Sequence, residues 1–119
     1  CGFKCASQIC FDLRFPEPWR VLAYDHGCDF VIHTSFDENS LQWNTFALTR
    51  ALENQYYLLS LNHAGKGLGK SLFCPPWLND KLHTKGTGEE ECFLECTLEK
   101  SIIEETRTDI PLKPSRRLF

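Results

Sequence analysis

A cysteine thiol followed by charged residues is the feature of this sequence that could do chemistry. Cys10 ends an apolar stretch, and the loop after it carries Asp12, Arg14 and Glu17 among apolar residues and prolines. A thiol attacks carbon as its thiolate, and it needs a position that a substrate carbonyl can reach and where hydrogen-bond donors converge. The end of a strand followed by a tight turn provides such a position, and the backbone N–H of Phe11 is a natural oxyanion donor.

Strands and helices alternate in the first half of the sequence, and this pattern would place Cys10 at the carboxyl end of a strand in a sheet. Residues 3–11 are largely apolar and end in the polar sequence DLRFPEP, which predicts a strand with Cys10 at its carboxyl end and then a loop. Strands that are apolar on both faces and alternate with helices predict an α/β fold whose sheet is covered on both sides. The later segments are, in order, a helix that begins near Pro16 and stops at Gly27, a strand at 29–33, a helix capped by Ser40, and a strand at 56–62.

The second half predicts a further strand, a short helix and an irregular tail. Residues 79–91 form a polar turn region, CFLECTL at 92–98 predicts a strand, and 99–107 predict a helix. The tail at 108–119 contains prolines and a basic pair, so we expect it to be extended and without regular structure. No repeat, low-complexity tract or linker divides the sequence, which predicts a single domain over 1–119.

Composition and charge exclude several classes of protein. The formal net charge is -3 and the isoelectric point is about 5.8, so no basic surplus favours binding to a nucleic-acid backbone. No apolar run approaches the roughly 20 residues that span a bilayer, so no membrane partner is expected. Seven cysteines, an odd number, lie among helix and strand patterns. This disfavours a secreted disulfide scaffold and favours a reducing, cytoplasmic setting.

Several segments resemble, in order, the nitrilase superfamily of carbon-nitrogen hydrolases. The segment QICFDLRFPEPW at 8–19 is similar to the superfamily's nucleophile motif, ICYDLRFPE, with Phe11 in place of the usual tyrosine. The resemblance implies that Cys10 is the catalytic nucleophile and that the N–H of Phe11 is its oxyanion donor. Further similar segments follow at 31–36 (VIHTSF), at 50–57 (RALENQYY) and at 60–62 (SLN), the last before a glycine-containing turn and Ser71.

The resemblance also implies a fold, a substrate class and an assembly. The fold is the C-terminal portion of a four-layer α-β-β-α sandwich, in which two sheets pack face to face between helices. The expected substrate is a small-molecule amide, which is favoured over a nitrile or a carbamoyl compound. No cofactor and no metal are expected. Subunits of such proteins pair as a homodimer or a larger homo-oligomer. Hydrolysis runs in two stages, in which Cys10 attacks and ammonia or an amine leaves, and water then hydrolyses the thioester.

The partners of the catalytic cysteine in the nitrilase superfamily are a glutamate base and a lysine, both well before it in the sequence. Only nine residues precede Cys10, and the sequence starts at Cys1 and contains no Met, so we expect a piece of a longer protein. A thiol without an oriented base has a pKa of about 8.5 and is only a few per cent ionised at neutral pH. We therefore expect the isolated chain to be essentially inactive. The alternative is a non-catalytic interaction or dimerisation module that has lost the base and the lysine.

Five charged residues are candidates for supporting the site. Asp12, Arg14 and Glu17 lie around one turn, and Arg50 and Glu53 lie on the second predicted helix. We predict a partly buried ion-pair network that holds the nucleophile turn, with no direct part in the chemistry. The simpler alternative is that the loop charges are solvated.

The loop after VIHT is the candidate substrate pocket. Ser35 and Phe36 occupy the region that shapes the acyl pocket in similar enzymes, which commonly have the sequence HPSAF. This chain has HTSF, one residue shorter and without the proline, so its pocket should differ in shape. An equal alternative is that Phe36 belongs to the core.

A phosphate-binding loop and a thiol redox pair are rival interpretations. The sequence AGKGLGKS at 64–71 fits a permissive phosphate-binding loop. Such a loop must open a helix, however, and Pro75 and Pro76 prevent one, so we predict a flexible turn between strands. A redox pair of Cys10 and Cys5 would need two residues that point to opposite faces of one strand.

Paired cysteines could also suggest a zinc site. Cys92 and Cys96 on a strand would stand about 13 Å apart, which is too far for two ligands of one ion. The same geometry applies to Cys1 and Cys5. Buried apolar thiols are the preferred interpretation of these residues.

Overall fold

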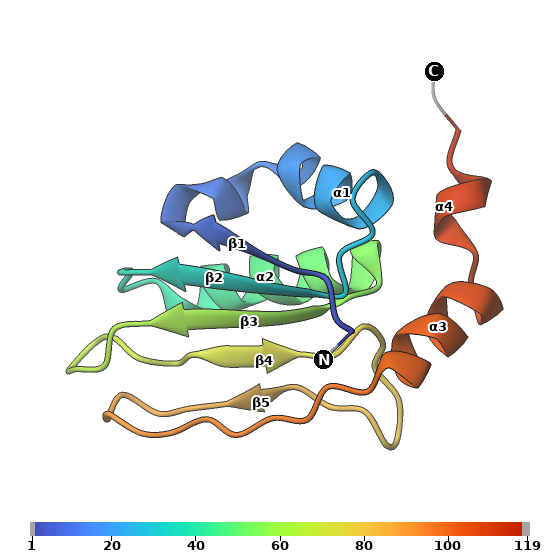
Figure 1. Cartoon of the computed structure of the whole chain (residues 1–119). Coiled ribbons are helices and arrows are strands. Elements are labelled where there is room, and N and C mark those ends of the chain that lie inside the picture. Colours follow the sequence, from blue (N-terminus) through green and yellow to red (C-terminus); the bar gives the residue numbers. More distant parts are fainter. Residues whose placement is uncertain (1, 118–119) are drawn as a thin grey trace.

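Within residues 2–117, which a computed structural model describes, one mixed five-stranded sheet organises the chain. The strand order is β1-β2-β3-β4-β5, so each strand lies beside the next along the chain (Figure 1). The predicted strands at 3–11, 29–33 and 56–62 are present, in line with the expected α/β arrangement. β1 (Cys5–Ile9), β2 (Phe30–Ser35) and β3 (Tyr57–Asn62) are parallel, whereas β4 (Leu72–Cys74) and β5 (Lys85–Gly86) are short and antiparallel.

Helices connect and flank these strands. α1 starts at Pro16 because the first helical residue needs no N–H donor. α2 is capped by Asn39, whose side chain accepts a hydrogen bond from the backbone N–H of Gln42 at 3.3 Å. The predicted cap, Ser40, is instead the first residue of the helix. The helical segments are η1, a 3-10 helix (Cys10–Arg14), α1 (Pro16–Tyr24), α2 (Ser40–Asn54), α3 (Lys100–Asp109) and α4 (Leu112–Ser115).

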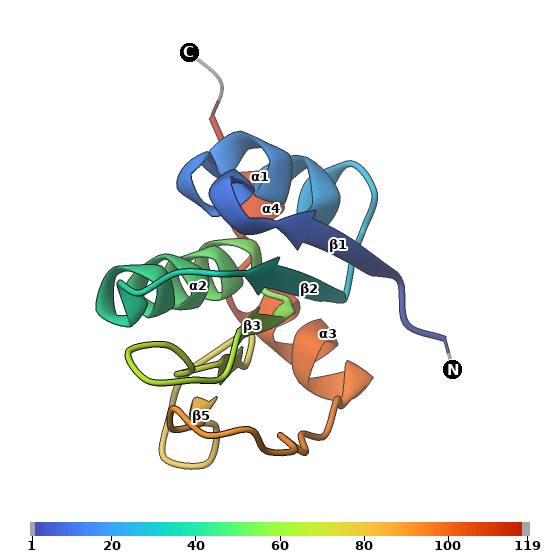
Figure 2. The same cartoon turned by 90° about the vertical axis from the view of Figure 1, so that its left-hand side faces the viewer.

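The two faces of the sheet are covered differently. Figure 2 shows α1 and α2 on one side of the strands and α3 on the other. On the first side, the buried side chains of Trp19, Trp43 and Ala47 pack with Val31 and Leu58 of the strands in the main core. The smaller core on the other side consists of Tyr57, Phe73 and Ile103, with Phe3, Phe30, Leu59, Leu94 and Leu98 packed against it.

The predicted strand at 92–98 is wrong, because residues 91–99 have no regular secondary structure. The segment runs along the edge of the sheet past β5 (Figure 1), and Lys85 of β5 reaches the carbonyl oxygen of Glu95 with its side chain. Leu94 and Leu98 pack against the smaller core, which accounts for the apolar pattern. A strand also needs a ladder of backbone hydrogen bonds to a neighbour, and β5 has only two residues.

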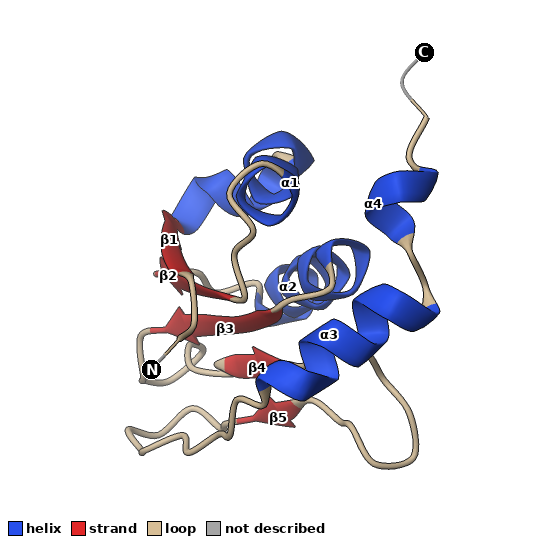
Figure 3. Cartoon of the chain, turned by 45° about the vertical axis from the view of Figure 1, so that its right-hand side comes forward, coloured by secondary structure: helices blue, strands red, loops and turns tan. Residues whose placement is uncertain are grey.

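The C-terminal tail is more regular than predicted. α3 continues to Asp109, and α4 follows after a short connection (Figure 3), so residues 108–115 are not an extended tail. Pro111 precedes α4 and Pro114 lies in its first turn, where backbone N–H groups have no helical acceptor and a proline is tolerated. Residues 118 and 119 of the predicted tail lie outside the described residues.

The loop at 64–71 is followed by the strand β4 and not by a helix. This agrees with the expectation that Pro75 and Pro76 prevent a helix there. It therefore joins two antiparallel strands. None of the helices in the described part of the chain has the length and apolar character needed to cross a membrane.

Candidate active site

Cys10 lies where β1 ends and η1 begins, so its own backbone forms the turn. Its φ of +43° is in the left-handed region, which costs a residue with a side chain about 1–3 kcal/mol. Asp12 offsets part of this cost. Its carboxylate accepts a hydrogen bond from the N–H of Ile9 at 3.0 Å, and its carbonyl oxygen accepts one from Nε1 of Trp19 at 2.9 Å. The thiol side chain is half-buried.

The buried side chain of Arg50 anchors this turn to α2. Its guanidinium donates hydrogen bonds to the carbonyl oxygens of Leu13 at 3.1 Å and Arg14 at 3.4 Å, and it pairs with Glu53 at 3.0 Å. Glu53 also pairs with Arg20 of α1 at 3.5 Å. Because Leu13 is fully buried, Arg50 satisfies a carbonyl group to which water has little access.

The predicted ion-pair network is therefore only partly correct. Arg50 and Glu53 do pair, but Asp12, Arg14 and Glu17 are exposed, and no ion pair within residues 2–117 includes any of them. The turn is so tight that Asp12 hydrogen-bonds to the backbone of the turn itself. Glu17 lies in the first turn of α1, where a negative charge interacts favourably with the helix dipole.

Arg14 packs against aromatic rings beside the turn. Its guanidinium carbon lies 5.7 Å from the ring centre of Phe11, 5.0 Å from that of Trp43 and 5.8 Å from that of Phe46. It also donates a hydrogen bond to Oε1 of Gln42 at 2.8 Å. These cation–π contacts hold the exposed ring of Phe11 next to Cys10.

His33 lies under the turn, and the sequence did not single it out as part of the site. Its side chain is fully buried, with Nε2 at 3.0 Å from the carbonyl oxygen of Cys10 and Nδ1 at 2.9 Å from Oγ of Ser60. Burial lowers the pKa of His33, while the hydrogen bond to Cys10 and the charge of Asp12 act in the opposite direction. The signal that could have identified it is a lone histidine at the end of the apolar strand predicted at 29–33.

The sequence profile of the carbon-nitrogen hydrolase family matches residues 2–101, which is most of the chain. The chain belongs to this family. The omega-amidase NIT3 of Saccharomyces cerevisiae is 30% identical over 96% of this chain and 41% of its own length. The 2-oxoglutaramate amidase of Bacillus subtilis is 28% identical over 93% of this chain and 44% of its own length. The chain thus spans less than half the length of these curated relatives.

The fold of the chain is also similar to the folds of solved structures. The crystal structure of Saccharomyces cerevisiae Nit3, a member of the nitrilase superfamily, matches with a TM-score of 0.82 and 27% identity over 96% of this chain and 44% of that one. An amidase from Nesterenkonia sp. AN1, in a structure that shows Michael addition of acrylamide at the active-site cysteine, matches with a TM-score of 0.67 and 26% identity over 92% and 44%. The predicted α/β fold of the nitrilase type is confirmed.

Ser35 is the last residue of β2 and Phe36 is the first residue after it, and the two differ in exposure. Ser35 is buried, and its hydroxyl donates a hydrogen bond to the carbonyl oxygen of Leu61 at 3.3 Å, so it ties β2 to β3. Phe36 is 61% exposed, and its ring meets that of His63 edge-on at 5.2 Å. The alternative that Phe36 is a core residue is therefore wrong, and its place beside a substrate stays a prediction.

The cysteines outside the nucleophile turn are not all buried thiols. Cys5, Cys92 and Cys96 are exposed, which contradicts the preferred interpretation from the sequence. The 13 Å separation expected for Cys92 and Cys96 also loses its basis, because that separation assumed a strand. Cys1 lies outside the described residues.

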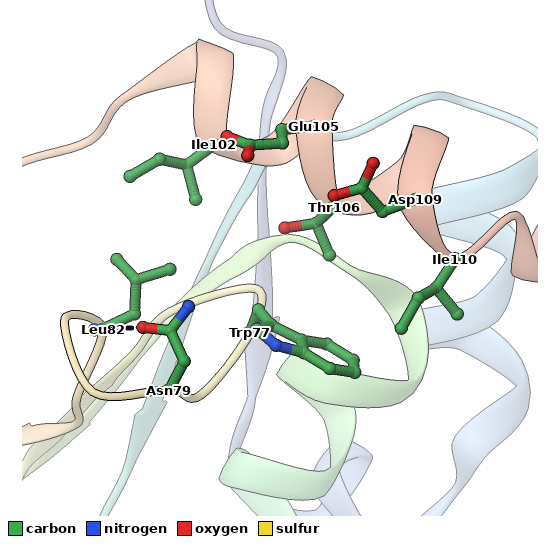
Figure 4. A pocket seen from close by; sticks show the side chains of 8 residues that line it. All are labelled: Trp77, Asn79, Leu82, Ile102, Glu105, Thr106, Asp109 and Ile110. Carbon is green, nitrogen blue, oxygen red and sulfur yellow. Dashed lines mark hydrogen bonds between the residues drawn. The ribbon is translucent and has the colours of Figure 1, made fainter.

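A pocket at the other end of the sheet is separate from the nucleophile. Arg107 of α3 donates hydrogen bonds to the carbonyl oxygens of Cys28 and Gln55, which precede β2 and β3. α3 therefore lies at the amino ends of the parallel strands, whereas Cys10 follows a carboxyl end. Figure 4 shows the pocket between α3 and the loop after β4, lined by Trp77, Asn79, Leu82, Ile102, Glu105, Thr106, Asp109 and Ile110.

Proposed function

We propose that the full-length protein hydrolyses a small-molecule amide and that Cys10 is the nucleophile. The supporting observation is the strained, half-buried turn that displays Cys10 at the carboxyl end of β1 in a carbon-nitrogen hydrolase chain. The similar amidase with acrylamide added at its active-site cysteine supports a thiol nucleophile. The similar proteins of yeast and Bacillus subtilis, an omega-amidase and a 2-oxoglutaramate amidase, favour an ω-amide as the substrate.

The proposed reaction proceeds through a thioester. The thiolate of Cys10 forms a bond to the amide carbon, the carbonyl oxygen becomes an oxyanion, and the C–N bond breaks as ammonia leaves with an added proton. Phe11 is the second residue of η1 and has no helical carbonyl three residues before it, so the helix does not use its N–H, which is free to bind the oxyanion. Water then attacks the thioester, releases the carboxylic acid and regenerates Cys10.

We propose that other parts of the full-length protein provide the base and the cation that this reaction needs. Two charged side chains of the turn are already engaged, Asp12 with the N–H of Ile9 and Arg14 with Gln42. The chain also spans less than half the length of its curated relatives. On this proposal, the 119 residues are the C-terminal portion of one hydrolase domain and are inactive alone.

Replacement of Cys10 in the full-length protein tests this function. We expect Cys10→Ser to lower kcat/KM for ammonia release from 2-oxoglutaramate by about 10³-fold or more, because an unactivated hydroxyl is a much weaker nucleophile than a thiolate. Mass spectrometry of the quenched wild-type protein should find an acyl group on the peptide that contains Cys10. Cys5→Ser is the matched control, because Cys5 is an exposed cysteine on β1, the strand that leads to Cys10. Hydrolysis that survives Cys10→Ser contradicts the proposal.

The assembly and the cellular compartment stay predictions, namely a homodimer or larger homo-oligomer and a cytoplasmic location. Size-exclusion chromatography with light scattering measures the first. The alternative function is a non-catalytic interaction or dimerisation module. A full-length protein that releases no ammonia from ω-amides, short-chain amides or carbamoyl amino acids would favour that alternative.

A further inference from the structure

We propose that His33 is a positioning residue that orients the oxyanion-binding N–H of Phe11 through the carbonyl group of Cys10. This inference rests on the proposed role of Cys10 as nucleophile and adds a residue to its machinery. The observation behind it is the hydrogen bond of 3.0 Å between Nε2 of His33 and the carbonyl oxygen of Cys10.

The carbonyl oxygen of Cys10 and the N–H of Phe11 belong to one peptide unit. A trans peptide is planar, and its C=O and N–H bonds point in opposite directions. When His33 holds the oxygen toward the core, the N–H must point away from the core. A donor to the carbonyl oxygen also polarises the amide and strengthens its N–H as a donor. This contact therefore contributes to both the direction and the strength of the oxyanion donor.

The neighbours of His33 determine where its proton lies. A carbonyl oxygen only accepts hydrogen bonds, so Nε2 must carry a proton, and the hydroxyl of Ser60 donates to Nδ1 of the neutral ring. Ser60 is buried and pairs in register with His33 on the adjacent strand. The rings of Trp19 and Trp43 meet the imidazole edge-on at 5.9 Å and 6.4 Å. The imidazole is therefore held in one orientation and one tautomer.

The same hydrogen bonds show why His33 acts through the peptide and not on the thiol. Nδ1 is occupied by Ser60 and Nε2 by the carbonyl oxygen of Cys10. Neither ring nitrogen is free to take the proton of the Cys10 thiol. His33 is therefore a positioning residue and not the general base of the reaction.

Two rates of the full-length protein, amide hydrolysis and alkylation of Cys10 by iodoacetamide, test this role. Hydrolysis builds an oxyanion at the amide carbonyl, whereas displacement of iodide from a saturated carbon does not. We expect His33→Phe to lower kcat about 100-fold, the usual cost of a lost oxyanion donor, with KM and the alkylation rate changed less than about threefold. His33→Gln keeps an N–H donor, and its kcat should be at least about tenfold higher than that of His33→Phe.

Two further variants serve as controls. His26→Phe removes an exposed histidine and should leave both rates unchanged. Ser60→Ala removes the hydrogen-bond partner of Nδ1, which helps to hold the ring in its orientation, so kcat should fall about fivefold at a constant alkylation rate, consistent with the loss of one indirect hydrogen bond. If His33→Phe does not fold, Ser60→Ala decides, because an unchanged kcat in that variant overturns the role of His33.

The outcomes separate the two proposals. If His33→Phe keeps its kcat while Cys10→Ser is inactive, the role of His33 is wrong and the proposed function stands. If kcat and alkylation fall together, the variant has disordered the turn, and the specific effect on the oxyanion donor is refuted. If Cys10→Ser is active, the proposed function itself fails.

Discussion

Cys10 and His33 satisfy each other's hydrogen-bonding groups although 23 residues separate them in the sequence. Without the histidine, the carbonyl oxygen of Cys10 would lose this hydrogen-bond donor in a partly buried turn, a loss of about 0.5–1.5 kcal/mol. Without that carbonyl, the fully buried ring of His33 would have an unpaired N–H. The left-handed backbone of Cys10 is therefore stabilised from the neighbouring strand as well as by Asp12.

The stability of the full-length protein should depend on pH through His33. Burial lowers the pKa of His33 in the folded state, whereas in the unfolded chain it has the ordinary value of about 6.5. Between these two values the unfolded state binds more protons than the folded state. The contribution of the neutral ring is therefore fully present above about pH 6.5, and below it the free energy of unfolding falls by up to about 1.4 kcal/mol per pH unit.

Urea unfolding of the wild type and of two variants at neutral and mildly acidic pH measures this dependence. His33→Gln should show a shallower fall with decreasing pH than the wild type, because glutamine does not titrate. His26→Gln removes an exposed histidine and should keep the wild-type slope. Equal slopes for the wild type and His33→Gln would contradict the prediction.

The glycine-rich loop between β3 and β4 packs its backbone against the segment that follows β5. The N–H of Gly69 donates a hydrogen bond to the carbonyl oxygen of His63 at 2.7 Å, and that of Lys70 to the carbonyl oxygen of Gly88 at 2.9 Å. Gly69 has a φ of +75°, and a Cβ there would overlap the carbonyl oxygen of Gly88. Close packing of two backbones thus explains this glycine without a phosphate ligand.

Two glycines of this loop separate backbone strain from steric overlap. Gly67 has a similar φ of +78° but no atom within 4 Å of its Cβ position, so Gly67→Ala should cost about 1 kcal/mol of unfolding free energy. Gly69→Ala adds the overlap with Gly88 and should cost about 2–4 kcal/mol. Chemical denaturation of both variants measures the difference. Equal losses would show that the segment after β5 moves aside at little cost.

Asp29 connects three parts of the molecule at the end of the sheet opposite Cys10. It lies just before β2, accepts a hydrogen bond from the N–H of Lys4 at 2.9 Å, and is almost fully buried. Its carboxylate pairs with Lys100 at 3.4 Å and Arg107 at 3.6 Å, both on α3. A buried carboxylate needs such partners, so Asp29 fastens α3 to the start of the sheet.

Removal of the charge at Asp29 should loosen α3 more than the strands. Asp29→Asn keeps the shape and the acceptor for Lys4 but loses both ion pairs, and we expect a loss of about 2 kcal/mol. Hydrogen exchange should accelerate at the amides of α3 while β2 and β3 stay protected. Asp109→Asn is the control, because it removes an exposed charge from the same helix. Uniform acceleration in all elements would contradict a local role.

Local sequence patterns were sufficient for the parallel strands, the first two helices and the place of Cys10 at a strand end. Apolar runs and helical spacing report on which face of an element is buried, and they do so within a few residues of sequence. The two prolines at 75 and 76 likewise ruled out a helix after the glycine-rich loop. Those signals are local, so a single sequence carries them.

The remaining features depend on contacts between residues far apart in the sequence. The pairing of Arg50 with two carbonyl groups of η1, the burial of His33 under Cys10 and the absence of a strand at 91–99 all follow from which segments meet in space. The local sequence around an arginine or a histidine does not indicate which residue it will contact. The same holds for an alternating apolar segment. The fold decides that partner, because hydrogen bonds and burial depend on distance in space and not on separation along the chain.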